Sequence, residues 1–101
     1  MTDINTIMQE EARLVILKEL AGQLNCSITS EAMRRYLLNN FLIDKPREWV
    51  EQEFYYLQAM KAVEVIPAGT VKIARLTERG EQHVKGLIFI PGVQRPSRAG
   101  I

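Results

Sequence analysis

The stretch from residue 63 to residue 80 constrains the fold of this chain more than any other. It reads VEVIPAGTVKIARLTERG, with two short segments rich in β-branched residues, 63–67 and 71–76, on either side of Ala68-Gly69-Thr70. Glycine supplies the backbone freedom that a tight turn needs. Because β-branched residues favour extended strands, this stretch predicts a β-hairpin.

A capped helix is expected directly after the hairpin. Thr77 is a good N-cap, because its hydroxyl can accept a hydrogen bond from a free amide of the first helical turn. The helix is expected over residues 78–85, closed by Gly86. A short apolar run follows at residues 87–90 and ends at Pro91-Gly92.

A first helix is expected over residues 4–24. Its apolar residues cover one broad face, which indicates burial against more than one neighbour. They are Ile4, Ile7, Met8, Leu14, Ile16, Leu17, Leu20, Ala21 and Leu24. Four short elements do not obviously cover so wide a face, so we expect a homodimer.

Two further helices are expected before the hairpin. After a β-prone segment at residues 26–29, Ser30 is the expected N-cap of the second helix. Asp44 is the expected N-cap of the third, which has a proline in its first turn and continues to about Met60. In the third helix, Val50, Phe54 and Leu57 recur at the spacing of one buried face.

This order predicts an α+β fold, a winged helix-turn-helix. It comprises a three-helix core, a short three-stranded sheet whose hairpin is the wing, and a fourth, C-terminal helix. We expect one domain over residues 1–90 and a flexible basic tail over residues 91–101. Helix-turn-helix proteins place a recognition helix in the DNA major groove, so double-stranded DNA is the expected partner.

The outward face of the third helix supplies the candidate base and phosphate contacts. Gln52 can pair with adenine, and Tyr55 can donate to a phosphate. Lys45 and Arg47 lie at the N-terminal end, where recognition helices often meet DNA. The alternative is a solvated polar face, because three acids of the same helix (Glu48, Glu51 and Glu53) would repel phosphates.

The wing and the tail offer further cationic candidates. Thr70 and Lys72 lie at the hairpin turn and on its second strand, where Lys72 either reaches a phosphate or is simply solvated. Arg95 and Arg98 resemble the arms that strengthen DNA binding, although they suit a solubilising terminus equally well.

A second set of residues suits a protein interface. Trp49, Tyr56 and Met60 form an apolar line that either fills the core or binds a partner protein. Leu87 and Phe89 of the apolar run extend this candidate surface.

Composition narrows the function classes. A net charge of +1 lies below the basic excess that is usual for nucleic-acid-binding proteins. A single cysteine, Cys26, excludes an internal disulfide and a multi-cysteine metal site. His83 is expected on the surface, no catalytic motif is found, and we expect neither an enzyme nor a cofactor. With no apolar run of membrane-spanning length and no signal peptide, a cytoplasmic protein is expected.

Four segments together resemble a known family: EEARLVILKEL, VEQEFYYL, IARLTERG and PGVQRP. The chain resembles the small winged-helix proteins of Mu-like phages and prophages, often described as arsenic-repressor-type regulators. The resemblance implies a DNA-associated phage protein without defined site residues. Lys61 replaces the glycine that is usual after the third helix, and the metal-sensing cysteines of arsenic repressors are missing.

Two functions are consistent with the sequence. The first is a dimeric DNA-binding protein of a Mu-like prophage that regulates transcription or assists a phage DNA transaction. The second is a protein-interaction adaptor in phage assembly or DNA packaging, which contacts other phage proteins and does not read DNA.

Overall fold

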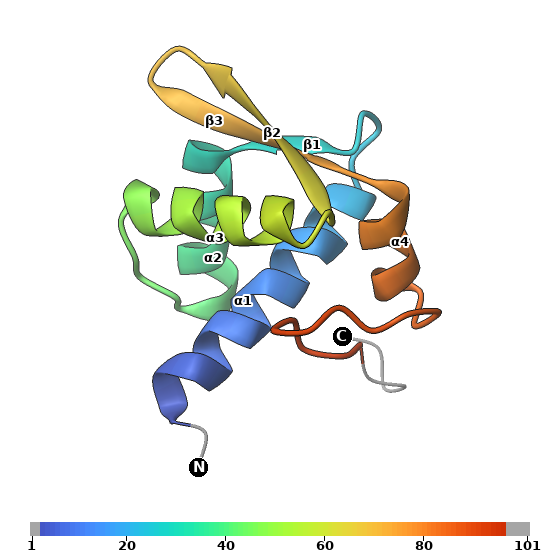
Figure 1. Ribbon diagram of the computed structural model, residues 1–101. Helices are drawn as coiled ribbons and strands as arrows, with labels where there is room; N and C mark the ends of the chain where they lie inside the picture. The colour runs from blue at the N-terminus through green and yellow to red at the C-terminus, as the bar shows by residue number, and fades with distance from the viewer. Residues whose placement is uncertain (1–2, 97–101) are drawn as a thin grey trace.

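The computed structural model describes residues 3–96 and shows an α+β fold of four helices and a small three-stranded antiparallel sheet (Figure 1). The elements are α1 (Ile4–Ala21), β1 (Ser27–Thr29), α2 (Ser30–Phe41), α3 (Arg47–Ala59), β2 (Val63–Ala68), β3 (Val71–Leu76) and α4 (Glu78–Val84). The predicted α+β class is confirmed, and the order of elements is compatible with a winged helix-turn-helix.

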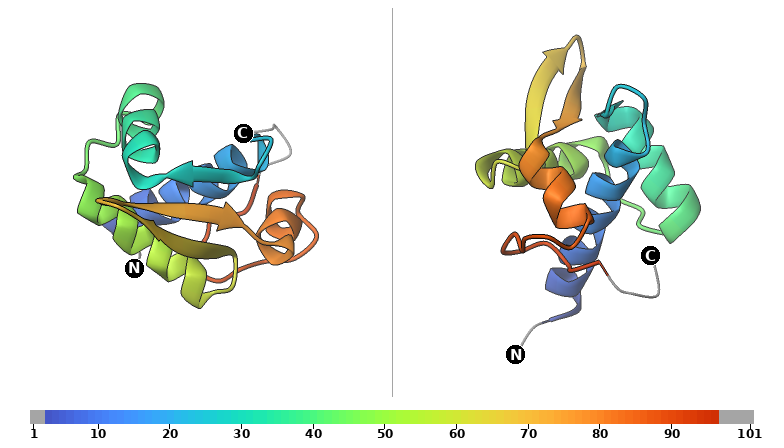
Figure 2. Two further views of the ribbon diagram at one scale, coloured as in Figure 1. Left: turned by 90° about the horizontal axis from the view of Figure 1, so that it is seen from above. Right: turned by 90° about the vertical axis from the view of Figure 1, so that its right-hand side faces the viewer.

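The sheet has the strand order β1-β3-β2 and lies over the helices, which leaves its other face uncovered (Figures 1 and 2). The predicted hairpin is present, but its connection is the two residues Gly69-Thr70, because Ala68, expected in the turn, belongs to β2. Pro67 is tolerated because β2 is an edge strand. The free amide of Val65 on this edge donates to the side chain of Gln58, so little of the edge remains available for another strand.

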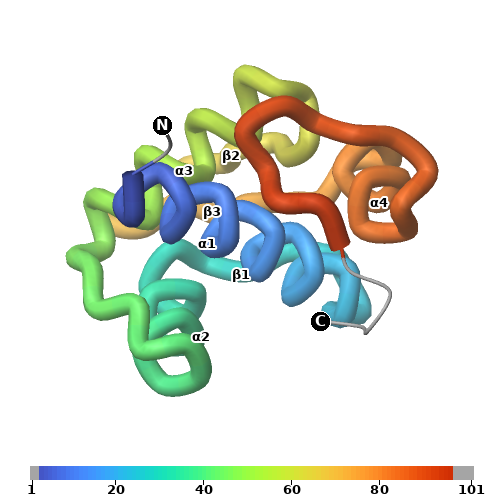
Figure 3. The backbone as a smooth tube through the Cα atoms, turned by 90° about the horizontal axis from the view of Figure 1, so that it is seen from below, coloured from blue at the N-terminus to red at the C-terminus, as the bar shows by residue number. Residues whose placement is uncertain are grey.

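Helix α1 runs through the centre of the molecule, surrounded by the other helices and the C-terminal segment (Figure 3). Six of its residues are buried: Ala12, Leu14, Val15, Ile16, Leu17 and Leu20. Of the nine residues of the predicted apolar face, only Leu14, Ile16, Leu17 and Leu20 are buried within the chain, so a homodimer is not needed to explain that part of the face. Ile4, Ile7 and Leu24 remain exposed.

Two of the three predicted helix caps are wrong. The hydroxyl of Thr29, not Ser30, accepts from the amide of Ala32 at the start of α2. Helix α3 begins after Pro46 without a side-chain cap, because its fixed φ of −68° already leads into the helix and its carbonyl accepts the first amides. The predicted cap by Thr77 is confirmed, since its hydroxyl accepts from the amide of Gly80.

Contacts made by the segment LTERG, residues 76–80, hold the start of α4 against the chain at the end of α3. The hydroxyl of Thr77 donates to the carbonyl of Lys61 at 2.7 Å, and Nε of Arg79 donates to the carbonyl of Met60 at 2.9 Å. Gly80 lies so close to the carbonyl of Ala62 that a Cβ atom would overlap it. This sequence motif therefore has a structural role at a helix–helix junction.

The structure differs from the expected domain boundary at residue 90. Ile90 and Val93 are fully buried, and the amide of Gln94 donates to the carbonyl of Glu10 on α1. Residues 91–94 therefore belong to the packed fold rather than to a flexible tail. The rest of the expected tail, from residue 97 onwards, lies outside the described residues.

Candidate nucleic-acid interface

The outward face of α3 is polar and accessible. Val50, Phe54 and Leu57 are buried, as predicted, so the opposite side of the helix faces solvent. On that side Glu48, Gln52 and Tyr55 are exposed, with Lys45 half-buried just before the helix. The ammonium group of Lys45 lies over the ring of Trp49, 5.8 Å from the ring centroid.

Two of the three acids in α3 are engaged within the molecule. Glu53 is 3% exposed and forms an ion pair with Arg13, which a hydrogen bond from Gln9 to the other carboxylate oxygen reinforces. Glu51 accepts a hydrogen bond from the hydroxyl of Ser30 at 2.7 Å and lies 3.5 Å from Nε of Arg47. Of these acids, only Glu48 is exposed on the outward face.

Ser30 fixes the hairpin relative to α3. Its fully buried hydroxyl donates to Glu51 and accepts from the amide of Lys72 at 3.0 Å, so one side chain links α2, α3 and β3. This role explains why Ser30 does not cap its own helix. As a result, the turn of the hairpin lies over the first half of α3 (Figure 2).

The two faces of the hairpin differ in character. Lys72 lies on the same face as the buried Ala74, toward the helices, because side chains two apart share a face of a strand. Thr70 is exposed at the turn. On the outer face, Glu64 pairs in register with Arg75, and Ile66 pairs with Ile73. Of the two cationic residues in the hairpin, Lys72 therefore lies on the inner face and Arg75 on the outer face.

Two predicted DNA contacts are not placed with the others. Nε of Arg47 is buried and faces Glu51 rather than solvent, although the side chain is 34% exposed. Arg95 stacks on Phe89 at 4.4 Å from the ring centroid, in a segment at the opposite end of the molecule from the hairpin turn (Figure 1). Arg98 lies outside the described residues.

The predicted protein-interface residues are divided between the core and the surface. Trp49 and Met60 are half-buried against the core. Tyr56 donates to the carbonyl of Pro91 and lies beneath Arg13, so it makes internal contacts. Leu87 and Phe89 remain accessible, at 69% and 47% exposed. Trp49, Tyr56 and Met60 therefore pack inside the molecule, which agrees with the core-filling alternative rather than with a partner-binding surface.

The surface position predicted for His83 is wrong. Its side chain is fully buried, with Nδ1 accepting from the amide of Ile90 at 3.0 Å and Nε2 lying 2.9 Å from the carbonyl of Gln94. The amide can donate only to an unprotonated nitrogen, so Nε2 carries the proton and donates to Gln94. His83 thus holds the C-terminal segment against α4.

The described part of the chain contains no cluster of three histidine, cysteine or acidic side chains that could hold a metal ion. Within residues 3–96, no helix is both long and apolar enough to cross a membrane. In comparisons with known proteins, the chain matches no protein-family model and no curated protein.

Proposed function

We propose that this protein is a winged helix-turn-helix protein that binds double-stranded DNA, with α3 in the major groove and the β2–β3 hairpin beside the backbone. The observation that carries this proposal is the charge arrangement of α3. Glu51 and Glu53 are engaged in internal contacts, so their repulsion of phosphates is largely offset. Among the three acids of α3, Glu48 is therefore the one whose charge would still repel DNA phosphates.

Each proposed contact has a chemical role. Gln52 is suited to pair with adenine through its amide, and Tyr55, which is 39% exposed, can donate to a phosphate. Lys45 and Lys72 supply positive charge at the start of α3 and on the adjoining strand. Thr70 can donate to the backbone from the hairpin turn. Arg47 contributes weakly, because Glu51 already offsets its charge.

The resemblance to proteins of Mu-like phages supports a role in transcriptional regulation or in another phage DNA transaction. A homodimer would place two such surfaces on neighbouring half-sites, as helix-turn-helix dimers do. With a net charge of only +1, we expect modest non-specific affinity and strong dependence on the sequence of the site.

A salt titration with fluorescent mixed-sequence duplex DNA tests this proposal. We expect micromolar binding at low salt, and the double variant Lys45→Ala with Lys72→Ala should reduce the slope of log affinity against log salt by about 2. The double variant Arg35→Ala with Lys85→Ala is the matched control, because it also removes two positive charges, from side chains that are 70% and 61% exposed and lie outside the proposed contacts. Absence of binding at low salt, or equal losses in the double variant and the control, would contradict the proposal.

One observation favours the adaptor function as a second candidate. Leu87 and Phe89 are exposed large apolar residues two positions apart on the loop after α4. Their area is small, since Trp49, Tyr56 and Met60 pack elsewhere. If DNA binding fails, a search for partner proteins that bind the wild type but not a Leu87→Ser, Phe89→Ser variant becomes the next test.

A further inference from the structure

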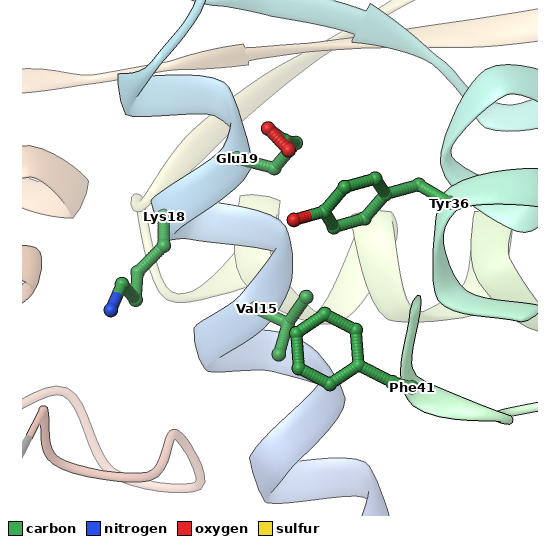
Figure 4. A pocket seen from close by; sticks show the side chains of 5 residues that line it. All are labelled: Val15, Lys18, Glu19, Tyr36 and Phe41. Atoms are coloured by element: carbon green, nitrogen blue, oxygen red, sulfur yellow. The ribbon is translucent and has the colours of Figure 1, made fainter. Parts of the chain in front are cut away.

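A pocket opens between α1 and α2, away from the residues proposed to contact DNA. Its volume is about 270 Å³. Five residues line it: Val15, Lys18 and Glu19 from α1, and Tyr36 and Phe41 from α2 (Figure 4). This volume lies just below the roughly 300 Å³ at which pockets for drug-sized ligands begin, so the pocket could hold only a ligand of a few heavy atoms.

The walls of the pocket are largely aromatic and aliphatic. The rings of Tyr36 and Phe41 lie 5.9 Å apart between centroids and are tilted by 55°. Val15, at 3% exposed, is the most buried of the lining residues. Because the faces of aromatic rings carry partial negative charge, two tilted rings favour a cation over an anion.

One carboxylate faces these rings. Glu19 extends from α1 on the same side as Tyr36, whereas the ammonium group of Lys18 points away from both rings (Figure 4). No salt bridge to Glu19 is found among residues 3–96. The pKa of Tyr36 is raised, first by burial and then by the hydrogen bond and charge of Glu19. The carboxylate of Glu19 therefore lies beside the aromatic wall with no ion-pair partner among the described residues.

We propose that this pocket binds a small organic cation, with its ammonium group facing Glu19 and its methyl or methylene groups against Tyr36 and Phe41. A carboxylate next to two aromatic rings offers charge attraction and cation–π attraction to the same group. An anionic ligand would meet repulsion from Glu19, and a neutral one would leave the carboxylate without a counter-charge. This proposal is independent of DNA binding.

Choline and its neutral isostere 3,3-dimethyl-1-butanol are suitable probes, because they share shape and differ in charge. Titrated into the isotopically labelled protein, choline should shift the NMR signals of Val15, Glu19 and Phe41 saturably in the millimolar range. We expect the neutral isostere to bind at least about fivefold more weakly. Bound choline should also lower the pKa of Tyr36, because its charge offsets that of Glu19.

Glu19→Gln tests the carboxylate without changing the size of the side chain. This variant should weaken choline binding about threefold, less than the loss seen with the neutral isostere, because the cation–π contacts to Tyr36 and Phe41 remain. Glu78→Gln, which removes an acid from α4, is the control and should bind choline as the wild type does. Equal affinity for choline and the isostere, unchanged binding by Glu19→Gln, or no saturable shift at the pocket would overturn the proposal. The spectrum of each variant also verifies its fold.

Discussion

The hydroxyl of Tyr56 donates a hydrogen bond of 2.9 Å to the carbonyl of Pro91, which fastens the last turns of α3 to the C-terminal segment. The guanidinium of Arg13 lies 3.7 Å from the centroid of the same tyrosine ring and donates to the carbonyl of Gly92. Gly92 has a φ of 82°, and a Cβ there would overlap the tyrosine hydroxyl. The position of the proposed DNA-binding helix therefore depends on residues 91–93 and on α1.

Arg13→Ala tests the buried contact between α1 and α3. The change leaves the carboxylate of Glu53, 3% exposed, without its counter-charge, so we expect the free energy of unfolding to fall by about 3 kcal/mol or more. Urea denaturation measures this value. Arg35→Ala, which removes an arginine side chain that is 70% exposed, should cost less than about 1 kcal/mol. Equal losses of unfolding free energy in Arg13→Ala and Arg35→Ala would contradict a buried ion pair between Arg13 and Glu53 that stabilises the fold.

Gly80→Ala tests the close approach of α4 to the chain after α3. The added methyl group would overlap the carbonyl of Ala62 and the side chain of Leu76, so we expect a loss of about 1–3 kcal/mol from overpacking. Gly22→Ala is the matched control, because its Cβ would meet only ordinary contacts and its φ is −82°. Thermal unfolding compares the two, and a Gly80→Ala variant as stable as Gly22→Ala would refute the steric argument.

The parts of the fold that depend on neighbours along the chain were predictable from the sequence. The β-hairpin, the cap at Thr77 and the buried line of Val50, Phe54 and Leu57 are confirmed, although Ala68 lies in β2 rather than in the turn. Each follows from a local rule: turn chemistry, capping or helical spacing.

Two of the errors concern side chains whose hydrogen-bond partners lie outside their own helix. Ser30 looks like a cap, but its hydroxyl bonds Glu51 and Lys72, 21 and 42 residues away. His83 looks like a surface residue, because the sequence does not show that the amide of Ile90 and the carbonyl of Gln94, the latter in the expected tail, fold back onto its ring. For the candidate site, the exposed stripe of α3 was predictable, whereas the internal pairing of Glu53 was not.

His83→Leu tests the attachment of the C-terminal segment. The apolar side chain leaves the amide of Ile90 and the carbonyl of Gln94 without partners, so we expect a loss of about 2–4 kcal/mol. Hydrogen exchange should show faster exchange of the Ile90 amide in particular. Gln82→Leu, the adjacent position on α4, serves as the control. Unchanged exchange at Ile90 in His83→Leu would contradict the assigned hydrogen bond.

Lys61→Gly tests the end of α3. Lys61 adopts the left-handed conformation, with a φ of 65°. The helix ends there because the amide of Lys61 donates to the carbonyl of Gln58 and the amide of Ala62 donates to the carbonyl of Leu57. Glycine removes the steric cost of this conformation but increases the entropy of the unfolded chain. We expect a net gain of about 0.5–1 kcal/mol in urea denaturation. Lys85→Gly, at a φ of −80°, should gain nothing, and a loss of stability in Lys61→Gly would contradict this assignment.

Acid titration tests the ion pairs at the start of α2. Hydrogen bonds from Arg34 lower the pKa of Glu31 from an ordinary 4.5 to about 2, and the charges of Arg34 and Arg35 contribute to the shift. A carboxyl whose pKa is lower in the folded protein stabilises the fold above its unfolded pKa and loses that contribution as the pH falls. The stability difference between wild type and Glu31→Gln should therefore shrink as the pH falls from about 4.5 to about 2. NMR titration of the Glu31 carboxyl gives the midpoint directly. Arg34→Ala should return it toward 4.5, whereas a wild-type midpoint already at 4.5 would show that these arginines do not hold the ionised form.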